Sequence, residues 1–149
     1  MNQQQLIFVP YDPKYGEQTV RMWRASKEDA IGQPEKHSFD NHVFFLNHSL
    51  SDQFEIKLAV IDDTVVGMIA YNEAEISQLY VHINYQAKGI GQRLLEFAKA
   101  KSNGRLTLYT FEVNKNAQRF YEKNGFKIIG RGHENEEKLP DILYEWNLA

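Results

Sequence analysis

Residues 79–95 read LYVHINYQAKGIGQRLL, and this stretch decides the fold. Residues 76–82 are mostly apolar or β-favouring and predict a strand, whereas residues 89–101 carry apolar side chains at helical spacing. The loop that joins the two contains Gly89 and Gly91. The first amides of a helix have no partner within the helix and lie at the positive end of its dipole. The turn therefore predicts a site for a phosphate or pyrophosphate group.

Two common nucleotide motifs do not fit this loop. A P-loop needs Gly-Lys-Ser/Thr, but the chain has Lys88 before Gly89. A dinucleotide fingerprint needs a third glycine where the chain has Leu94. The remaining pattern is Gln86-x-x-Gly89-x-Gly91, which by itself also fits a plain glycine-rich helix start.

A second segment makes the pattern specific, because residues 114–126 read NKNAQRFYEKNGF. Together the two segments resemble the GNAT family of acyl-CoA-dependent N-acyltransferases. The first is similar to the family's pyrophosphate signature, Gln/Arg-x-x-Gly-x-Gly/Ala. The second is similar to its Asn-x-x-Ala-x-x-Phe/Leu-Tyr-x-x-x-Gly-Phe segment. One departure is Ile83, where the family often has proline.

The hydrophobic pattern of the whole chain predicts the order β-α-α-β-β-β-α-β-α-β-β. Strands are expected at residues 6–11, 56–61, 65–71, 76–82, 106–111, 126–130 and 142–146. Helices are expected at residues 15–30, 89–101 and 116–123. A further helix is expected to begin after a cap at Asp40. This is an α/β (α+β) order, and it matches the GNAT fold, with a mixed central sheet of about seven strands and about four flanking helices. In that family the fourth and fifth strands splay apart. The length of 149 residues predicts one such domain over residues 1–149.

The composition excludes several classes of function. The chain has no cysteine, which excludes disulfides, thiolate metal sites and a cysteine nucleophile, so acetyl transfer must be direct. The net charge of −3 argues against a general nucleic-acid partner. The sequence contains no run of about 18 apolar residues, so no membrane-spanning helix is expected. No signal peptide is recognisable at the start, so a cytoplasmic protein is expected.

The resemblance also implies where acetyl-CoA binds. The backbone amides of the glycine loop would hold the pyrophosphate: Gln86, Ala87, Lys88, Gly89, Ile90 and Gly91. The preceding strand would lie along the pantetheine arm through Leu79, Tyr80 and Val81. Asn114, Ala117, Phe120 and Tyr121 would line the other side of that arm, although ordinary core packing would also explain Phe120.

Tyr121 is the residue that the resemblance implies for catalysis. A phenol directed at the sulfur can protonate the thiolate that amine attack expels. The acceptor amine must also lose a proton, and Glu73, Glu75, His82 and Glu112 are candidate bases, each acting directly or through water. We rank Glu75 and Glu112 first among them.

The acceptor is less well specified. Residues 132–141 form an acidic loop that favours a small cationic amine through its local field, although a solvated hairpin loop would look the same. The spacing of His37, His42 and His48 does not place two rings on one helix face, so no metal site is expected.

The sequence therefore predicts an N-acetyltransferase that moves an acetyl group directly from acetyl-CoA to a primary amine in a ternary complex, releasing CoA. Two alternatives stay open. The acceptor can be a protein amine, or the chain can be a non-catalytic module that binds or senses acyl-CoA. A homodimer is also compatible with the resemblance.

Overall fold

The computed structural model describes residues 5–148. Its strands are β1 (Leu6–Pro10), β2 (Glu55–Ile61), β3 (Thr64–Tyr71), β4 (Ile76–Val81), β5 (Arg105–Phe111), β6 (Lys127–Gly132) and β7 (Asp141–Asn147). Its α-helices are α1 (Gly16–Ile31), α2 (Phe39–Phe45), α3 (Ser51–Gln53), α4 (Ile90–Lys101) and α5 (Lys115–Lys123). A π-helical segment, Leu46–Leu50, continues α2, and short 3-10 turns precede α1 and follow β4.

The strands form two antiparallel sheets instead of one continuous sheet. The first has the order β1-β2-β3-β4, and the second has the order β5-β7-β6. The two sheets meet where β4 and β5 begin, through a parallel bridge between Glu75 and Thr107. The expected seven strands and mixed α/β architecture are confirmed, and the division of the sheet falls between the fourth and fifth strands.

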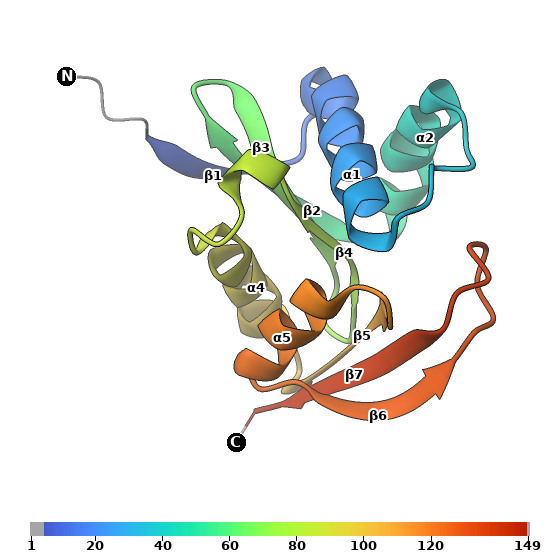
Figure 1. Cartoon of the computed structure of the whole chain (residues 1–149). Coiled ribbons are helices and arrows are strands. Elements are labelled where there is room, and N and C mark those ends of the chain that lie inside the picture. The colour runs from blue at the N-terminus through green and yellow to red at the C-terminus, as the bar shows by residue number, and fades with distance from the viewer. Residues whose placement is uncertain (1–4, 149) are drawn as a thin grey trace.

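Helices cover both faces of the first sheet (Figure 1). On one face, Val20, Trp23 and Leu46 of the α1–α2 region pack against β2 and β3 in one apolar cluster. On the other face, Leu94 of α4 and Tyr121 of α5 belong to a second cluster, which also includes side chains of the second sheet. The α4–α5 cluster therefore joins the two sheets below the point where β4 and β5 separate.

Local signals explain most helix ends. Gly32, at φ 71°, ends α1, and Gly125, at φ 91°, follows α5. The predicted cap of the second helix is wrong by two residues. Ser38 caps α2 because its Oγ accepts a hydrogen bond from the backbone N–H of Asn41 at 3.1 Å. Asp40 instead lies in the first turn, where a carboxylate is favourable near the positive end of the helix.

Candidate active site

The free edge of β4 is the first element of the site. The backbone N–H of His82 donates to Val66 O of β3 at 2.8 Å, and partners alternate along an antiparallel pair. Leu79 and Val81 therefore direct their backbone polar groups away from β3, towards β5. In agreement, Val81 O accepts hydrogen bonds from two side chains, Ser26 Oγ at 2.9 Å and Gln86 Nε2 at 3.0 Å. Past the Glu75–Thr107 bridge, an extended ligand can pair with this edge.

The glycine loop leads from β4 into α4. Gly89 is the N-cap of α4 with φ +86°, a conformation that other residues adopt only with strain. The first turn of α4 contains no acidic residue, and no side chain caps its amides. Gly91 has a different role, because a Cβ there would come within 3.3 Å of Phe120 Cζ. The loop thus presents free helix amides to an anion, which fits the pyrophosphate of acetyl-CoA.

Helix α5 brings four of the predicted residues towards β4. Asn114 Oδ1 accepts from Ala117 N at 3.1 Å and so caps α5, which leaves its Nδ2 group as the donor for a ligand. Ala117 and Tyr121 line the cleft described below. Phe120 does not, because its ring packs against Gly91 and the α4 cluster. The core-packing interpretation of Phe120 therefore accounts for its position.

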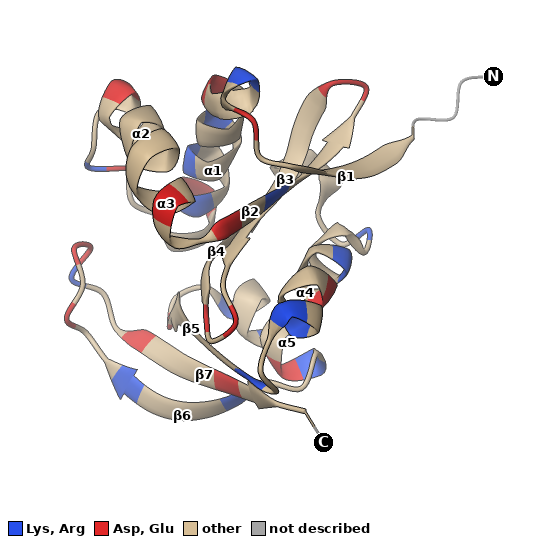
Figure 2. Cartoon of the chain, turned by 180° about the vertical axis from the view of Figure 1, so that it is seen from behind, with Lys and Arg blue, Asp and Glu red and all other residues tan. Residues whose placement is uncertain are grey.

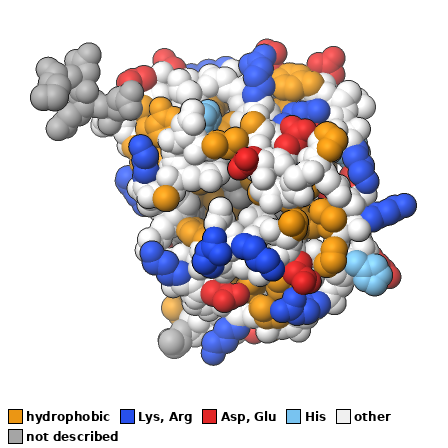
Figure 3. All heavy atoms as spheres, viewed as in Figure 1, with side chains coloured by type: hydrophobic (Ala, Val, Ile, Leu, Met, Phe, Trp, Pro, Cys, Tyr) orange, Lys and Arg blue, Asp and Glu red, His pale blue; other side chains and the backbone are white. Residues whose placement is uncertain are grey.

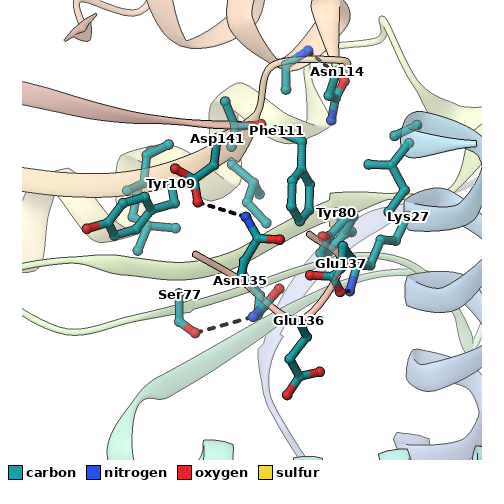
Figure 4. Close-up of a pocket in the computed structure, with 18 of the residues that line it drawn as sticks. Lys27, Ser77, Tyr80, Tyr109, Phe111, Asn114, Asn135, Glu136, Glu137 and Asp141 are labelled. Carbon is teal, nitrogen blue, oxygen red and sulfur yellow. Dashed lines mark hydrogen bonds and ion pairs between the residues drawn. The ribbon is translucent and has the colours of Figure 1, made fainter. Parts of the chain in front are cut away.

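A cleft of about 1180 Å³ opens between the diverging strands. Its walls come from β4, β5, the start of α5, one face of α1, α2, and the loop between β6 and β7. Figure 4 shows Phe111 of β5 below Asn114, and Tyr80 of β4 beside Lys27 and Glu137. Of the predicted residues, the cleft brings together Leu79, Tyr80, Asn114, Ala117 and Tyr121.

Two buried phenols lie in this cleft. Burial raises the pKa of Tyr121 far above its usual value, and the neighbouring Tyr80 phenol adds to the effect. Burial also raises the pKa of Tyr80 to about 12, partly opposed by the charge of Lys27. Both hydroxyls therefore keep their protons at neutral pH, which suits a proton donor.

The two carboxylates ranked first as bases lie outside the cleft lining. Glu75 lies where β4 and β5 touch, and its side chain is exposed. Glu112 follows β5, with a carboxylate oxygen 3.5 Å from Arg131 Nη1. These positions do not support a direct contact between either carboxylate and an amine beside Tyr121. The catalytic role of Glu75 and Glu112 therefore stays a prediction.

An ion cluster closes the α1 end of the cleft. Lys27 Nζ lies 2.7 Å from Glu137 Oε2 and 3.5 Å from Glu35 Oε2, and all three side chains are largely buried. Burial by itself lowers the pKa of Lys27, but the hydrogen bond to Glu137 and the nearby carboxylate charges raise it overall. For Glu35, burial acts to raise the pKa, but the charge of Lys27 and a backbone hydrogen bond lower it overall. Lys27 is therefore ionised and fixed in place.

His42 lies beside this cluster on α2 and is buried against Trp23, with ring centroids 4.3 Å apart. Burial lowers the pKa of His42 to about 4, so the ring is neutral at physiological pH. Among residues 5–148, no group of three or more potential ligands could hold a metal ion.

Sequence reasoning did not identify Lys27, Glu35 or His42 as residues of the cleft. Lys27 and Glu137 are 110 positions apart, and no spacing rule connects them. The only sequence signal was the acidic loop, and two of its carboxylates contact cationic groups or histidine of this chain: Glu136 contacts His37 and Glu137 contacts Lys27.

On the face in Figure 3, basic and acidic side chains lie side by side over α4 and α5. Within residues 5–148, no helix has both the length and the apolar character needed to cross a bilayer.

The fold and the cleft fit an acyltransferase, and comparison with known proteins shows that class. The family model described as "Acetyltransferase (GNAT) domain" matches residues 52–128, about half of the chain. The chain belongs to the GNAT acetyltransferase family, whose enzymes use acetyl-CoA.

Relatives within the family act on different acceptors, according to their names. The chain is 29% identical to a peptidyl-lysine N-acetyltransferase, YjaB, of Salmonella typhimurium over 131 residues, which covers 84% of this chain and 86% of the relative. It is also 29% identical to a spermidine N(1)-acetyltransferase of Thermoplasma acidophilum over 125 residues, covering 76% and 71%. The PaiA N-acetyltransferase of Thermoplasma acidophilum, solved in complex with coenzyme A, shares the fold with a TM-score of 0.71 at 21% identity, covering 96% and 99%.

Proposed function

We propose that the chain transfers an acetyl group directly from acetyl-CoA to a primary amine in a ternary complex, with a small cationic amine as the favoured acceptor. The observation that carries the proposal is the position of Tyr121. Its phenol lines a cleft between the free edge of β4 and α5, and the adjacent Phe120 packs against the glycine loop. This arrangement supports our proposal that the Tyr121 phenol protonates the sulfur of an acetyl-CoA molecule held by that loop.

Acetyl-CoA supplies the activated carbonyl group as a thioester. We propose that backbone N–H groups on the free edge of β4, near Val81, donate hydrogen bonds to the carbonyl oxygen as it gains charge. The amine nitrogen bonds to the carbonyl carbon, the C–S bond breaks, and Tyr121 donates its proton to the sulfur. The nitrogen of the new amide then releases its extra proton, which restores the Tyr121 phenol through water. Burial that raises the pKa of Tyr121 also raises that of a thiol formed beside it, which keeps the proton transfer feasible.

The acceptor amine arrives mostly protonated, since a free alkyl amine has a pKa near ~10. We propose that water-mediated transfer carries this proton to a carboxylate, with Glu75 and Glu112 as the predicted bases. The chain has no cysteine, so no acetyl-thiol enzyme form competes with direct transfer.

The charge of the cleft supports a cationic acceptor. Besides three histidines, its lining holds five carboxylates against two cationic side chains, Lys27 and Arg131. The carboxylates are Glu35, Glu134, Glu136, Glu137 and Asp141. Such an excess attracts an ammonium group and disfavours an anionic acceptor. The spermidine relative acts on an amine of this class by its name, whereas the peptidyl-lysine relative keeps a protein acceptor open as the second candidate.

The experiment that tests the proposal is Tyr121→Phe, assayed by release of free thiol across a set of amines. We expect turnover to fall by about 10²–10⁴, the usual contribution of a placed acid, while acetyl-CoA binding is unchanged. Tyr71→Phe is the matched control, because it removes another buried tyrosine hydroxyl, bonded to Glu55 Oε2 at 2.7 Å and outside the cleft lining. Unchanged turnover in Tyr121→Phe would remove that residue from the mechanism. Acetyl-CoA binding without thiol release for any amine would identify a non-catalytic binding module instead.

A further inference from the structure

The loop between β6 and β7, residues 133–140, crosses from the second sheet to α1. We refer to it as the strap. In Figure 1 it extends from β6 and β7 towards α1 and α2, and Figure 2 shows acidic positions and one basic position along it. Strap residues line the cleft together with the facing side of α1. The strap therefore forms the wall of the cleft opposite the α5 end, where Asn114 lies.

The strap is folded by its own side chains. Asn135 Nδ2 donates to Leu139 O at 2.8 Å and to Asp141 Oδ2 at 3.0 Å, and Asn135 Oδ1 accepts from Leu139 N at 3.2 Å. These three bonds close the loop around one amide group, which lowers the number of conformations that the strap can adopt.

Three contacts hold the folded strap against the α1–α2 region. Lys27 Nζ lies 2.7 Å from Glu137 Oε2, and His37 Nε2 lies 2.7 Å from Glu136 Oε2. Lys36 Nζ also donates to the backbone oxygen of Glu136. The Lys27–Glu137 pair is largely buried, with side-chain exposures of 17% and 13%. The His37–Glu136 pair is exposed and therefore contributes less to holding the strap in place.

We infer that the strap, fixed by the Lys27–Glu137 pair, limits the size of the acceptor, so that this chain acetylates small free amines and excludes lysine side chains carried by a peptide. A thin alkylamine can enter a cleft whose far wall is joined to α1. A peptide backbone on both sides of the reacting lysine would have to displace the strap and break a buried ion pair. The inference rests on the proposed acetyl transfer and selects between its two acceptor classes.

Two substitutions detach the strap in different ways. Glu137→Ala removes the carboxylate but leaves Lys27 paired with Glu35, so no charge is stranded in the interior and the fold is retained. Lys27→Met leaves Glu35 and Glu137 facing each other without a cation, which repels the strap from α1. Glu17→Gln is the matched control, because it breaks an exposed ion pair to Arg21, 3.6 Å away, on the same helix.

The experiment compares kcat/KM for 1,4-diaminobutane with that for a capped pentapeptide that has a single central lysine. We expect the unmodified chain and Glu17→Gln to prefer the diamine by at least about 100-fold. We expect Glu137→Ala and Lys27→Met to reduce that preference by about tenfold or more, mainly through a lower KM for the peptide. Amide hydrogen exchange should become faster at residues 133–140 in both variants and stay unchanged in the control.

The possible outcomes distinguish a failure of the strap inference from a failure of the proposed acetyl transfer. If the unmodified chain acetylates the peptide as well as the diamine, or if the ratio does not change in Glu137→Ala although strap exchange becomes faster, the inference is overturned and the acetyl transfer stands. If no amine is acetylated by chain that binds acetyl-CoA, the proposed function fails and the inference fails with it.

Discussion

The two glycines of the loop before α4 meet different physical requirements. Gly89 provides a left-handed backbone, at φ +86°, with open space where a side chain would be. Gly91 provides room for the ring of Phe120. A sequence motif gives the same residue type at both positions. Only the structure shows that Gly89 is required for backbone conformation and Gly91 for packing.

A substitution at Gly89 can test this distinction. Gly89→Ala forces an alanine into the left-handed region, which costs about 1–2 kcal/mol and tilts the first amides of α4 away from the anion site. We expect acetyl-CoA affinity to fall by about tenfold or more, measured by titration calorimetry. Gly104→Ala is the control, since Gly104 also has positive φ, +97°, but lies outside the cleft and the glycine loop. Equal affinity losses in both variants would mean that the loop geometry does not hold the cofactor.

At the scale of elements, the contact between α1 and α2 depends on a neutral histidine. His42 packs edge-on against Trp23, and its Nδ1 lies 3.4 Å from Arg24 Nη1. The charged groups that act on its pKa are Glu35, Arg24, Lys27 and His37, and the burial effect exceeds all of them. Protonating this ring would place a second cation beside Arg24, so the packing of α2 favours the neutral form.

This contact predicts a pH dependence of stability. The pKa of His42 is about 4 in the folded chain, below its ordinary value near ~6.5. Between these values the unfolded chain binds a proton that the folded chain does not, so the free energy of unfolding decreases as pH falls from about 6.5 towards 4. His42→Gln should flatten the dependence of the free energy of unfolding on pH between about 6.5 and 4, measured by urea unfolding.

The variant should still lose stability below about pH 4.5, where carboxylates with lowered pKa, such as Glu35, take up protons. His48→Gln, at an exposed position in the following π-helical turn, should keep the slope. A slope that is the same in His42→Gln would show that another group titrates.

The elements themselves could be predicted from the sequence because their signals are local. Alternating apolar residues and turn residues such as Asp62 and Asp63, both at positive φ, mark strands and hairpins within a few positions of where they form. The cap of α2 was misplaced because Ser38 and Asp40 are both good capping residues, and only the path of the chain selects between them.

At the scale of the whole molecule, the cleft exists because two sheets share a beginning and then diverge. The residues proposed to hold the cofactor belong to two short segments with a recognisable pattern, so the sequence alone could point to them. The residues at the acceptor end of the cleft could not be predicted, because contacts such as Lys27–Glu137 join residues far apart in the chain. Burial of Lys27, which holds its charge in a fixed position, could not be predicted from the sequence either. Tertiary contacts of this kind leave no period or spacing in the sequence.

The divergence of the sheets leads to a last prediction. If the pantetheine arm pairs with the free edge of β4, bound acetyl-CoA must protect the backbone amides of Leu79 and Val81 from hydrogen exchange, because those groups face the gap. The amides of β2 paired with β1, such as Leu58 opposite Val9, should exchange at the same rate with and without ligand and serve as the internal control. At a ligand concentration of about 100 times the dissociation constant, the ligand should also stabilise the chain by about 2.7 kcal/mol in a thermal unfolding experiment, whereas NAD and ATP should have no effect. Protection confined to the first turn of α4 would place only the pyrophosphate in the site, and the strand pairing would then be wrong. Because the ligand would supply the pairing that β4 lacks, its binding would extend the connection between the two sheets beyond the Glu75–Thr107 bridge.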